Sequence, residues 1–376
     1  MLVFSRRHFL RIGACCAATA LLGATSGCKG ENDPFSPTRK IIDDVGREVE
    51  IPRVDKLGKV YFTSPLAQIF CFTVAPDLLG GTATSFSREQ LDYLPEGSEN
   101  LVNMGSLSGN GSIDIDVLKE SGIQLIFSIS GTDLTDVNIE DALALQEQSG
   151  IPVVLIDGSF DCIGDTYRLL GECLGRKERA EVLAQYCEDI YKRVTEAVAA
   201  VPESERVSYL FAEGPDGLLT EPDVSQHSIA FNVAGGVNVA GDVDPNETGR
   251  RAGKANNYDM VNISIDEVRA WDPEVIITWD SEKRSGAESL IRVSSNWSDV
   301  SAVKNDRVYA MPSLPFAFCD RPPGINRFLG IQWLANLFYP QYYDVDMVEV
   351  VRDFYATCYW REISEQQAKH ILGLDD

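Results

Sequence analysis

Short, almost wholly apolar runs alternate with longer amphipathic stretches along most of this chain. In the first half, β-strands are predicted at Lys59–Phe62, Leu125–Ile129 and Val153–Ile156. Helices are predicted between them, among others at Pro65–Val74 and Ile139–Gln148. Short apolar strands separated by helices are typical of parallel sheets that helices cover on both faces. The pattern therefore predicts an α/β fold.

A long amphipathic segment interrupts this alternation near the middle of the chain. No proline occurs from Asp165 to Ala200, and apolar side chains recur there every three or four positions, at Leu183, Tyr186, Ile190, Val194 and Val198. We predict one helix over roughly Lys177 to Val201. A second series of strands follows, at Val207–Phe211, Val275–Thr278 and Val308–Met311. The chain thus reads as an α/β domain, a long helix and a second α/β domain.

The first 28 residues have the features of an export signal. Paired arginines within Ser5–Arg11 precede the short apolar run Ile12–Leu22, and small residues lead up to Cys28. These segments resemble a twin-arginine signal and a lipoprotein cleavage site. We therefore expect residues 1–27 to be removed and Cys28 to carry a lipid on the outer face of the cytoplasmic membrane. The alternative, a membrane-spanning anchor, needs about 20 apolar residues, and this run is shorter.

The net charge of the chain limits its possible functions, and its length limits the number of domains. Removing the signal takes away three arginines and no acid, so the formal charge goes from −24 to −27. Such an acidic protein repels phosphate backbones, which excludes nucleic-acid binding. About 350 residues remain, which favours two domains. We expect a tether at residues 28–40, lobes at residues 41–163 and 202–376, and the linker helix within residues 164–201.

Six cysteines follow Cys28 at irregular spacings, at Cys71, Cys162, Cys173, Cys187, Cys319 and Cys358. No Cys-x-x-Cys pair is present, so neither a zinc ribbon nor a thioredoxin-like motif is supported. We expect mostly free, structural thiols, and Cys71 in particular is predicted to be a small buried apolar side chain.

A short pattern occurs once in each half of the chain. Ile115-Asp116-x-Leu118 and Ile265-Asp266-x-Val268 precede a predicted strand at the same spacing. Asp116 and Asp266 are therefore each expected at the start of a helix that leads into a buried strand. One interpretation is helix capping, because an acid at a helix N-terminus satisfies free amides and contributes about 1 kcal/mol.

Four segments, taken in order, together resemble the class III solute-binding proteins of ABC importers, a family that serves ferric siderophores, haem, cobalamin and some metal oxyanions. Ile42–Pro52 is similar to the first hairpin of that family, and Trp271–Ile277 to a strand of its second lobe. Trp297–Tyr309 resembles the segment before its last strand. Asp320-Arg321-Pro322-Pro323-Gly324 and the residues up to Asn336 match a subgroup associated with iron complexes or metal ions.

This resemblance implies two Rossmann-like lobes with central parallel sheets, joined by a long rigid helix, with the ligand held between the lobes. It implies that an ABC permease and its ATPase are the partners. It also gives Asp116 and Asp266 a second interpretation, because one Glu on each lobe of these proteins contacts arginines of the permease. We expect a monomer that has no cofactor and is not an enzyme.

Candidate ligand-binding residues in the second lobe include three arginines. Arg250 and Arg251 belong to a basic loop, and Arg321 lies before two prolines that stiffen its backbone. Arginine binds carboxylates, catecholate oxygens and oxyanions through paired hydrogen bonds. Phe316 would supply an apolar wall beside Arg321. The alternative for Arg250 and Arg251 is a solvated basic loop paired with nearby acids. The alternatives at Arg321 are that it forms a salt bridge with Asp320 or that Asp320 caps the following helix.

Further candidates come directly after predicted strands, where α/β domains place their ligand contacts. They are Thr63, Ser64 and Ser130 in the first lobe and Trp279 in the second. Only two histidines remain after the signal, so no metal site is predicted. His227 is expected to be structural and His370 to be solvated.

The leading hypothesis is a lipid-tethered receptor for an iron complex, either a ferric siderophore or haem. A receptor of the same fold for molybdate or tungstate is the alternative cargo. An exported α/β hydrolase is a different class, and the chain has no G-x-S-x-G, H-E-x-x-H or P-loop motif to support it. A surface adhesion or sensory module would have no partner permease.

Overall fold

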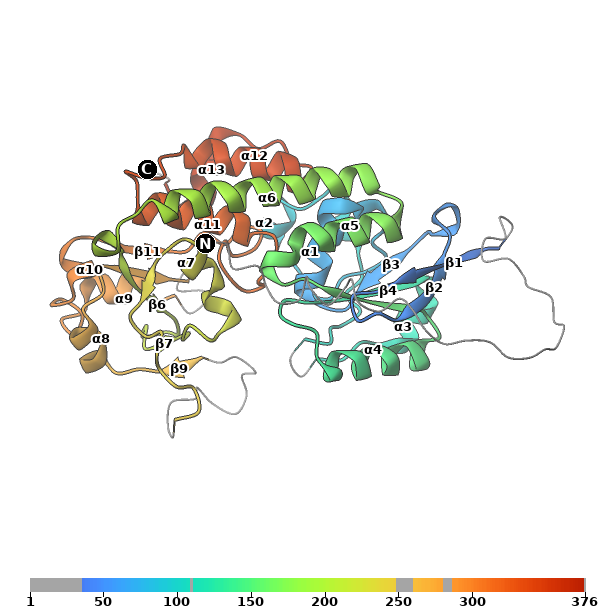
Figure 1. The fold of residues 1–376 in the computed structure, drawn as a ribbon, viewed down its shortest axis with the longest axis horizontal. Coiled ribbons are helices and arrows are strands. Elements are labelled where there is room, and N and C mark those ends of the chain that lie inside the picture. Colours follow the sequence, from blue (N-terminus) through green and yellow to red (C-terminus); the bar gives the residue numbers. More distant parts are fainter. Residues whose placement is uncertain (1–35, 109–110, 248–259, 280–285, 375–376) are drawn as a thin grey trace, which may run out of the picture. The chain divides into compact units, whose positions relative to one another are not determined.

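Two separate parallel sheets form the framework of the computed structural model, which describes residues 36–108, 111–247, 260–279 and 286–374 (Figure 1). The first sheet has the order β3 (Val60–Phe62), β4 (Leu125–Ser130), β5 (Val153–Asp157). The second has the order β11 (Val308–Ala310), β10 (Val275–Thr278), β6 (Ser208–Ala212), β8 (Val237–Asn238). Two antiparallel pairs accompany them, β1 (Thr38–Ile42) with β2 (Glu48–Pro52) and β7 (Leu219–Thr220) with β9 (Val261–Asn262). We call the parts around the two sheets the first lobe and the second lobe.

Alternate side chains of the central strands enter different apolar cores, as the period of two in a strand requires. In β4, Leu125 and Phe127 belong to one core and Ile126 to another. In β10, Val275 and Ile277 belong to the same core as Leu125, while Ile276 faces a third core. The near-continuous apolar runs of these strands therefore arise because both faces of each sheet are covered.

Helices on one side of both sheets share the first of these cores. They are α1 (Pro65–Val74), α5 (Ile163–Leu174), α6 (Lys177–Ala199), α7 (Ile229–Val233), α11 (Arg327–Phe338), α12 (Met347–Tyr359) and α13 (Glu365–Ile371). The opposite faces have their own helices, α3 (Ile115–Glu120) and α4 (Asp136–Ser149) in the first lobe and α8 (Ile265–Trp271), α9 (Glu288–Val293) and α10 (Ser301–Lys304) in the second. The short helix α2 (Arg88–Leu91) has no buried residue, and its Leu91 packs against the edge of the shared core. One continuous core thus joins the two lobes.

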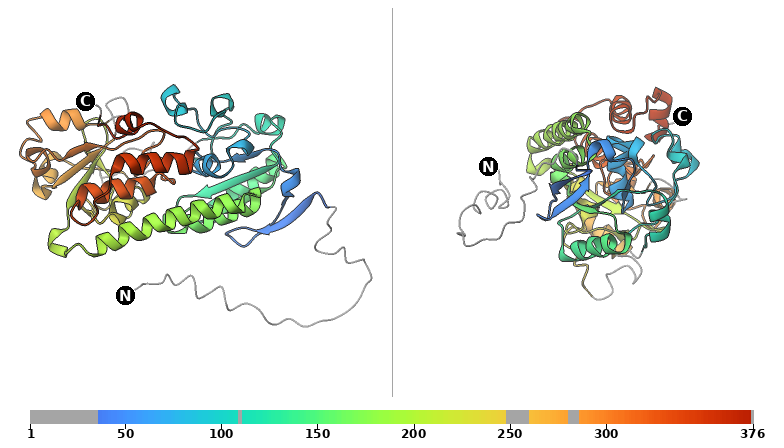
Figure 2. Two further views of the ribbon diagram at one scale, coloured as in Figure 1. Left: turned by 90° about the horizontal axis from the view of Figure 1, so that it is seen from above. Right: turned by 90° about the vertical axis from the view of Figure 1, so that its right-hand side faces the viewer.

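The long helix α6 links the two lobes through this core. It packs against α5 at one end and against α11 of the second lobe at the other (Figure 2). Its buried face is small and apolar, with Ala180, Leu183, Cys187, Ile190 and Val194. The predicted helix from Lys177 is confirmed. The wider interval 164–201, however, also holds all of α5 except its first residue, because Gly175 separates α5 from α6 in the left-handed conformation at φ 68°.

Aromatic pairs strengthen the junction between the lobes. The ring centres of Phe160 and Phe328 are 4.6 Å apart, and those of Phe86 and Phe316 are 6.0 Å apart. Such closely packed interiors resist deformation. We therefore expect only small relative motion of the lobes.

The other predictions on strands, helices and cysteines agree with the structure, except that the fold begins earlier than predicted. β1 begins at Thr38, so the hairpin starts three residues before the predicted beginning of the fold at Ile41. All six described cysteines after Cys28 are free, and only Cys162 is not fully buried. In the described residues, no helix is both long enough and apolar enough to cross a bilayer.

Gly330 in α11 offers a test of this packing. A Cβ atom at Gly330 would lie 2.4 Å from the carbonyl oxygen of Phe318, so even alanine displaces backbone. We expect Gly330→Ala to lower the free energy of unfolding by about 1–3 kcal/mol, measured by urea denaturation. In Gly58→Ala the new methyl meets only the end of the Gln124 side chain, and the change should stay within about 0.5 kcal/mol. Equal stability of Gly330→Ala and the wild type would contradict the packing.

Candidate binding site in the second lobe

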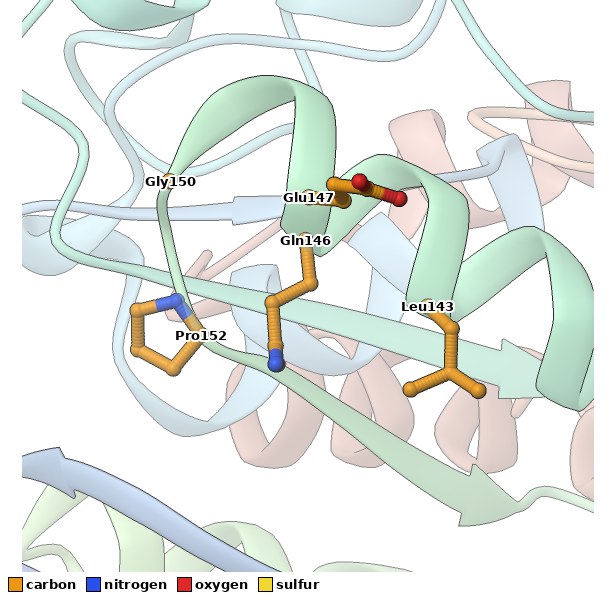
Figure 3. Close-up of a pocket in the computed structure, with 5 residues that line it drawn as sticks. All are labelled: Leu143, Gln146, Glu147, Gly150 and Pro152. Atoms are coloured by element: carbon orange, nitrogen blue, oxygen red, sulfur yellow. The ribbon is translucent and has the colours of Figure 1, made fainter.

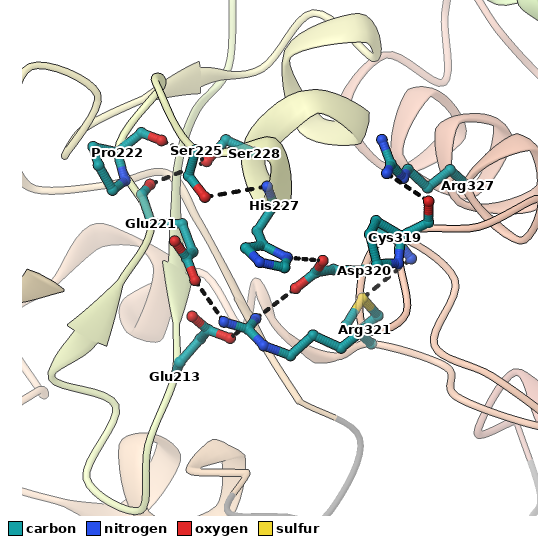
Figure 4. Close-up of polar contacts among 12 residues, drawn as sticks. Glu213, Glu221, Pro222, Ser225, His227, Ser228, Cys319, Asp320, Arg321 and Arg327 are labelled. Carbon is teal, nitrogen blue, oxygen red and sulfur yellow. Dashed lines mark hydrogen bonds and ion pairs between the residues drawn. The ribbon is translucent and has the colours of Figure 1, made fainter. Parts of the chain in front are cut away.

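Five ionisable side chains meet beside the carboxyl end of the second sheet (Figure 4). Glu213 directly follows β6 and Glu221 directly follows β7, while Asp320 and Arg321 lie in the loop between β11 and α11. His227 belongs to the 3-10 turn Gln226–Ser228. The three acids and the histidine are buried. Because buried charges cost several kcal/mol unless they are paired, the cluster has to balance its charges internally.

Arg321 is the centre of this cluster. Its Nη1 donates to Glu213 and lies 2.5 Å from Asp320 Oδ2, and its Nη2 lies 2.5 Å from Glu221 Oε1. The side chain of Arg321 is 13% exposed, while those of its three carboxylate partners are fully buried. Its guanidinium carbon lies 5.0 Å from the centre of the half-buried Trp279 ring. Arg321 and Trp279 are thus the parts of this assembly that a ligand can reach.

Asp320 remains ionised because it has two cationic or donor partners. Its second oxygen bonds with Nδ1 of His227. Burial raises the pKa of Asp320, but Arg321 and His227 outweigh burial and hold that pKa below its ordinary value. The salt-bridge alternative for Arg321 is therefore what the structure shows. Asp320 does not cap the following helix, since Asn326 occupies the N-cap of α11.

The pKa of Glu213 is shifted in the opposite direction from that of Asp320. Burial, together with the nearby Glu221 and Asp320, holds the pKa of Glu213 well above its ordinary value despite Arg321. Glu213 and Glu221 contact the same guanidinium, since Nη1 of Arg321 donates to Glu213 and Nη2 lies 2.5 Å from Glu221 Oε1. Burial among neighbouring acids therefore favours the neutral form of Glu213.

The backbone of Arg321 is held in an unfavourable conformation. Its φ is 49°, in the left-handed region that costs a residue with a side chain about 1–2 kcal/mol. Such residues persist where surrounding contacts determine their position, and they occur often at ligand clamps. The three ion pairs supply those contacts here.

The predicted residues of the first lobe lie at the carboxyl ends of β3 and β4. Thr63 is buried and its hydroxyl lies 3.3 Å from Ser128 Oγ. Ser64 caps α1, since its Oγ accepts a hydrogen bond from the amide of Ala67. Ser130 Oγ accepts one from the amide of Thr132. Local hydrogen bonds therefore already use the hydroxyls of Ser64 and Ser130, and Thr63 is no longer accessible.

The two lobes approach each other at these strand ends. A Cβ atom on Gly131, directly after β4, would lie 3.2 Å from Gln226 Oε1 and 3.6 Å from Pro323 Cγ of the second lobe. Glycine at this position permits that approach. The carboxyl ends of the two sheets thus lie close to one another, although they belong to separate lobes.

Phe316 requires a correction. The sequence predicts it as an apolar wall of the cleft beside Arg321, but the residue is only 4% exposed. It packs between Phe86 of the first lobe and Tyr359 of α12. Apolar neighbours on both sides draw it into the core between the lobes. Arg250, Arg251 and Cys28 lie outside the described residues.

Asp116 and Asp266 occupy equivalent places in the two lobes, each as the second residue of a helix that leads into the middle of a sheet. Neither acid caps the free amides, because the side chains that cap these helices belong to Asp114 and Ser264, but each lies in the first turn, where its charge favours the helix dipole. Both carboxylates are exposed, and Asp266 is 3.4 Å from Nη1 of Arg269. Their side chains are therefore available to a partner.

Among the described residues, surface hollows also occur away from this cluster. One, of about 550 Å³, lies at the turn between α4 and β5 and is lined by Leu143, Gln146, Glu147, Gly150 and Pro152 (Figure 3). This is the amino end of β5, opposite to the edge where α/β folds bind ligands. Another, of about 670 Å³, is at the junction of α5 and α6. No group of three or more His, Cys, Asp or Glu side chains suited to a metal ion occurs among the residues described.

Sequence reasoning missed Glu213 and Glu221 and gave His227 only a structural role. Glu213 carries a signal that could have identified it, since it directly follows a predicted strand of the second lobe. Glu221 and His227 carry none, because loops of irregular length bring them to Arg321. His227 is indeed buried, and His370 is about half exposed, as predicted.

Comparison with solved structures gives similar folds over most of the chain. An ABC transporter solute binding protein from Sulfurospirillum deleyianum DSM 6946 is similar with a TM-score of 0.78 and 24% identity, covering 89% of this chain and 99% of that one. MolA of Haemophilus influenzae bound to molybdate has a TM-score of 0.66 and 21% identity, covering 87% and 99%. CeuE of Helicobacter pylori in a Ni-His complex has a TM-score of 0.61 and 15% identity, covering 88% and 98%.

Sequence comparison adds one curated relative and one family. The molybdate-binding protein MolA of Haemophilus influenzae is 32% identical over 98 residues, which are 26% of this chain. The match spans 27%, about a quarter, of the length of MolA. A model of the periplasmic binding protein family matches residues 125–315, which is half of the chain and runs from β4 through α6 and β6 to the loop after β11. The chain belongs to the periplasmic binding protein family.

Proposed function

We propose that this protein is the extracytoplasmic receptor of an ABC importer and that it captures an iron complex, a ferric siderophore or haem, between its two lobes. It delivers this cargo to a permease that is driven by an ATPase. Export by the signal at residues 1–27 and a lipid on Cys28 would keep the receptor on the outer face of the cytoplasmic membrane, where it works as a monomer. The lobes are residues 41–163 and 202–376.

The arrangement of Arg321 over Trp279 carries the proposal on cargo. A guanidinium lies 5.0 Å from the centre of an aromatic ring beside the carboxyl edge of the second sheet. Catecholate siderophores and haem combine flat aromatic surface with anionic oxygens. Such a molecule can stack on Trp279 while its charge approaches Arg321.

Molybdate is the second candidate, and the similarity to the molybdate-binding protein MolA favours it. A small tetrahedral oxyanion needs a closed nest of donors that meet all of its oxygens. The described groups next to Arg321, however, are three carboxyls and the Trp279 ring, which do not form a closed nest of donors. The geometry therefore favours the larger iron complex.

A binding role fits the family better than the other classes considered. Members of the periplasmic binding protein family bind solutes and are not enzymes, which argues against an exported hydrolase. An adhesion or sensory module would not need two exposed carboxylates at equivalent places in the two lobes. Permease docking by Asp116 and Asp266 does need them.

Thermal unfolding of the mature chain with candidate cargoes tests this function. A ligand present at 100 times its dissociation constant should raise the free energy of unfolding by about 2.7 kcal/mol. We expect a ferric siderophore or haem to give this increase. The iron-free siderophore is the control for nonspecific binding. An increase with molybdate alone would select the second candidate, and no increase with any of them would contradict the receptor function.

A further inference from the structure

Arg327, the first residue of α11, is a buried arginine with unused hydrogen-bond donors. The residue is only 1% exposed. Its Nη2 donates to the carbonyl oxygen of Pro323 at 2.5 Å, whereas its Nε and Nη1 have no partner among the residues described. A donor that is buried without an acceptor loses its hydrogen bonds to water and gains none in exchange. The N–H groups of Arg327 therefore require an acceptor that the described residues do not supply.

The charge of Arg327 has no ion-pair partner in the described part of the chain either. Asp320 acts on it electrostatically, but the oxygens of Asp320 already pair with Arg321 and His227. Figure 4 shows the guanidinium of Arg327 apart from that cluster. Burial lowers the pKa of Arg327 to about 10, against the opposing effect of Asp320, so the side chain is still cationic at neutral pH. A water molecule would satisfy the donors of Arg327 but not its buried charge, which favours an anion as the acceptor.

Arg327 lies where the two lobes meet. Its guanidinium carbon is 5.4 Å from the centre of the Phe160 ring of the first lobe, and that ring packs against Phe328 of α11 with ring centres 4.6 Å apart. The 12-residue helix α11 begins at Arg327, and the positive end of its dipole favours a negative charge there. The first three amides of α11 already donate to carbonyl oxygens of residues 324–326. The unused donors at this place are therefore those of the Arg327 side chain.

We propose that Arg327 holds one small inorganic anion, of the kind of chloride, at the junction of the lobes. The anion accepts hydrogen bonds from the unused donors of Arg327 and balances its charge. It has to be small because Arg327 is 1% exposed and the Phe160 ring covers the guanidinium. The same burial keeps a siderophore or haem away from Arg327. The anion is thus a structural ligand separate from the cargo, and the inference does not depend on the proposed function.

Anomalous diffraction with bromide tests the site directly. Bromide is similar to chloride in charge and size, and its anomalous scattering distinguishes it from water. We expect crystals of the mature chain in sodium bromide to show an anomalous peak within hydrogen-bond distance of Nε or Nη1 of Arg327. An ordered water without an anomalous signal at this position would overturn the inference.

Urea denaturation at constant ionic strength tests whether the anion belongs to the folded protein in solution. Chloride replaces gluconate, a much larger anion, so that screening of this acidic chain stays the same. We expect the equilibrium constant of unfolding to fall by up to about tenfold for each tenfold increase in chloride, as for one anion bound by the folded state alone. A bromide peak without any dependence of stability on chloride would mean an adventitious ion only and would also overturn the inference.

Arg327→Met removes the donors and the charge, and we expect it to lose both the bromide peak and the chloride dependence. Arg179→Met is the matched control. Arg179 also stacks on a ring, that of Trp360 at 4.0 Å, and donates to the carbonyl oxygens of Thr73 and Thr357, but it has no buried donor without a partner. This control should keep the chloride dependence of the wild type. The opposite results, dependence kept in Arg327→Met or lost equally in both variants, contradict the site, and the two wild-type measurements decide the question if Arg327→Met does not fold.

Discussion

Arg321→Leu should destabilise the cargo-free protein by about 3–5 kcal/mol at neutral pH, measured by urea denaturation. Leucine removes the guanidinium that contacts Glu213, Glu221 and Asp320, and it leaves their carboxyls buried. Breaking a buried ion pair from one side costs much more than the net contribution of the pair, because the charges that remain are unpaired. The loss therefore reports how far this cluster is shielded from water.

The pH dependence of this loss has a definite sign. Without Arg321 the buried carboxyls bind protons more tightly in the folded protein than in the unfolded chain. Stability then falls as the pH rises through and above the ordinary pKa range of carboxyls, about 4. The difference between Arg321→Leu and the wild type should be largest at neutral pH and should shrink as the pH is lowered toward that range.

Arg168 provides a matched control on the surface. It also has three carboxylate partners, with Nη1 2.7 Å from Glu188, Nη2 2.9 Å from Glu181, and Asp165 at 3.6 Å, but its side chain is 37% exposed. Exposed ion pairs contribute about 0–1 kcal/mol, so Arg168→Leu should change stability by no more than that. Equal losses from the two substitutions would show that the Arg321 cluster is not shielded.

The sequence predicted the framework of this protein well because its strands and helices have strong local patterns. Val275–Ile277 is apolar, and the strand predicted over Val275–Thr278 forms β10 with the same bounds. Ser64 and Pro65 give a cap and a first helical residue, and α1 begins and ends where the pattern places it. These signals lie within a few residues of each other, so no knowledge of tertiary contacts is needed to use them.

The candidate site was harder to predict because its contacts are long-range. Glu213 and Glu221 are about 100 residues from Arg321 in sequence, and only the folded second lobe brings their side chains together. Phe316 shows the reverse problem. Its neighbourhood in the sequence resembles an exposed loop, yet Phe86 of the first lobe and Tyr359 of α12 pack against its ring. Burial of this kind depends on elements far away in the chain.

Charge reversal of both docking candidates, Asp116→Arg with Asp266→Arg, should reduce cargo uptake by cells to the level of a strain that lacks the protein. This expectation rests on the proposed function and on the family resemblance, which places permease arginines opposite these positions. Two exposed carboxylates on separate lobes would then be replaced by like charges, which repel the permease at both ends of the interface. Radiolabelled uptake of the identified cargo measures the effect.

Binding and stability should remain close to those of the wild type, since neither carboxylate caps its helix and both are exposed. The dissociation constant of the cargo should be unchanged, and loss of favourable helix-dipole interactions should cost about 0.3–1 kcal/mol at each position. Glu178→Arg with Glu349→Arg is the matched control, because these exposed acids lie in the first turns of α6 and α12, on the other side of the sheets. Normal uptake by the Asp116 and Asp266 variant would contradict docking, and so would an equal loss of uptake in the control. Only a specific interface with the permease makes these two carboxylates more important for uptake than another pair of surface acids.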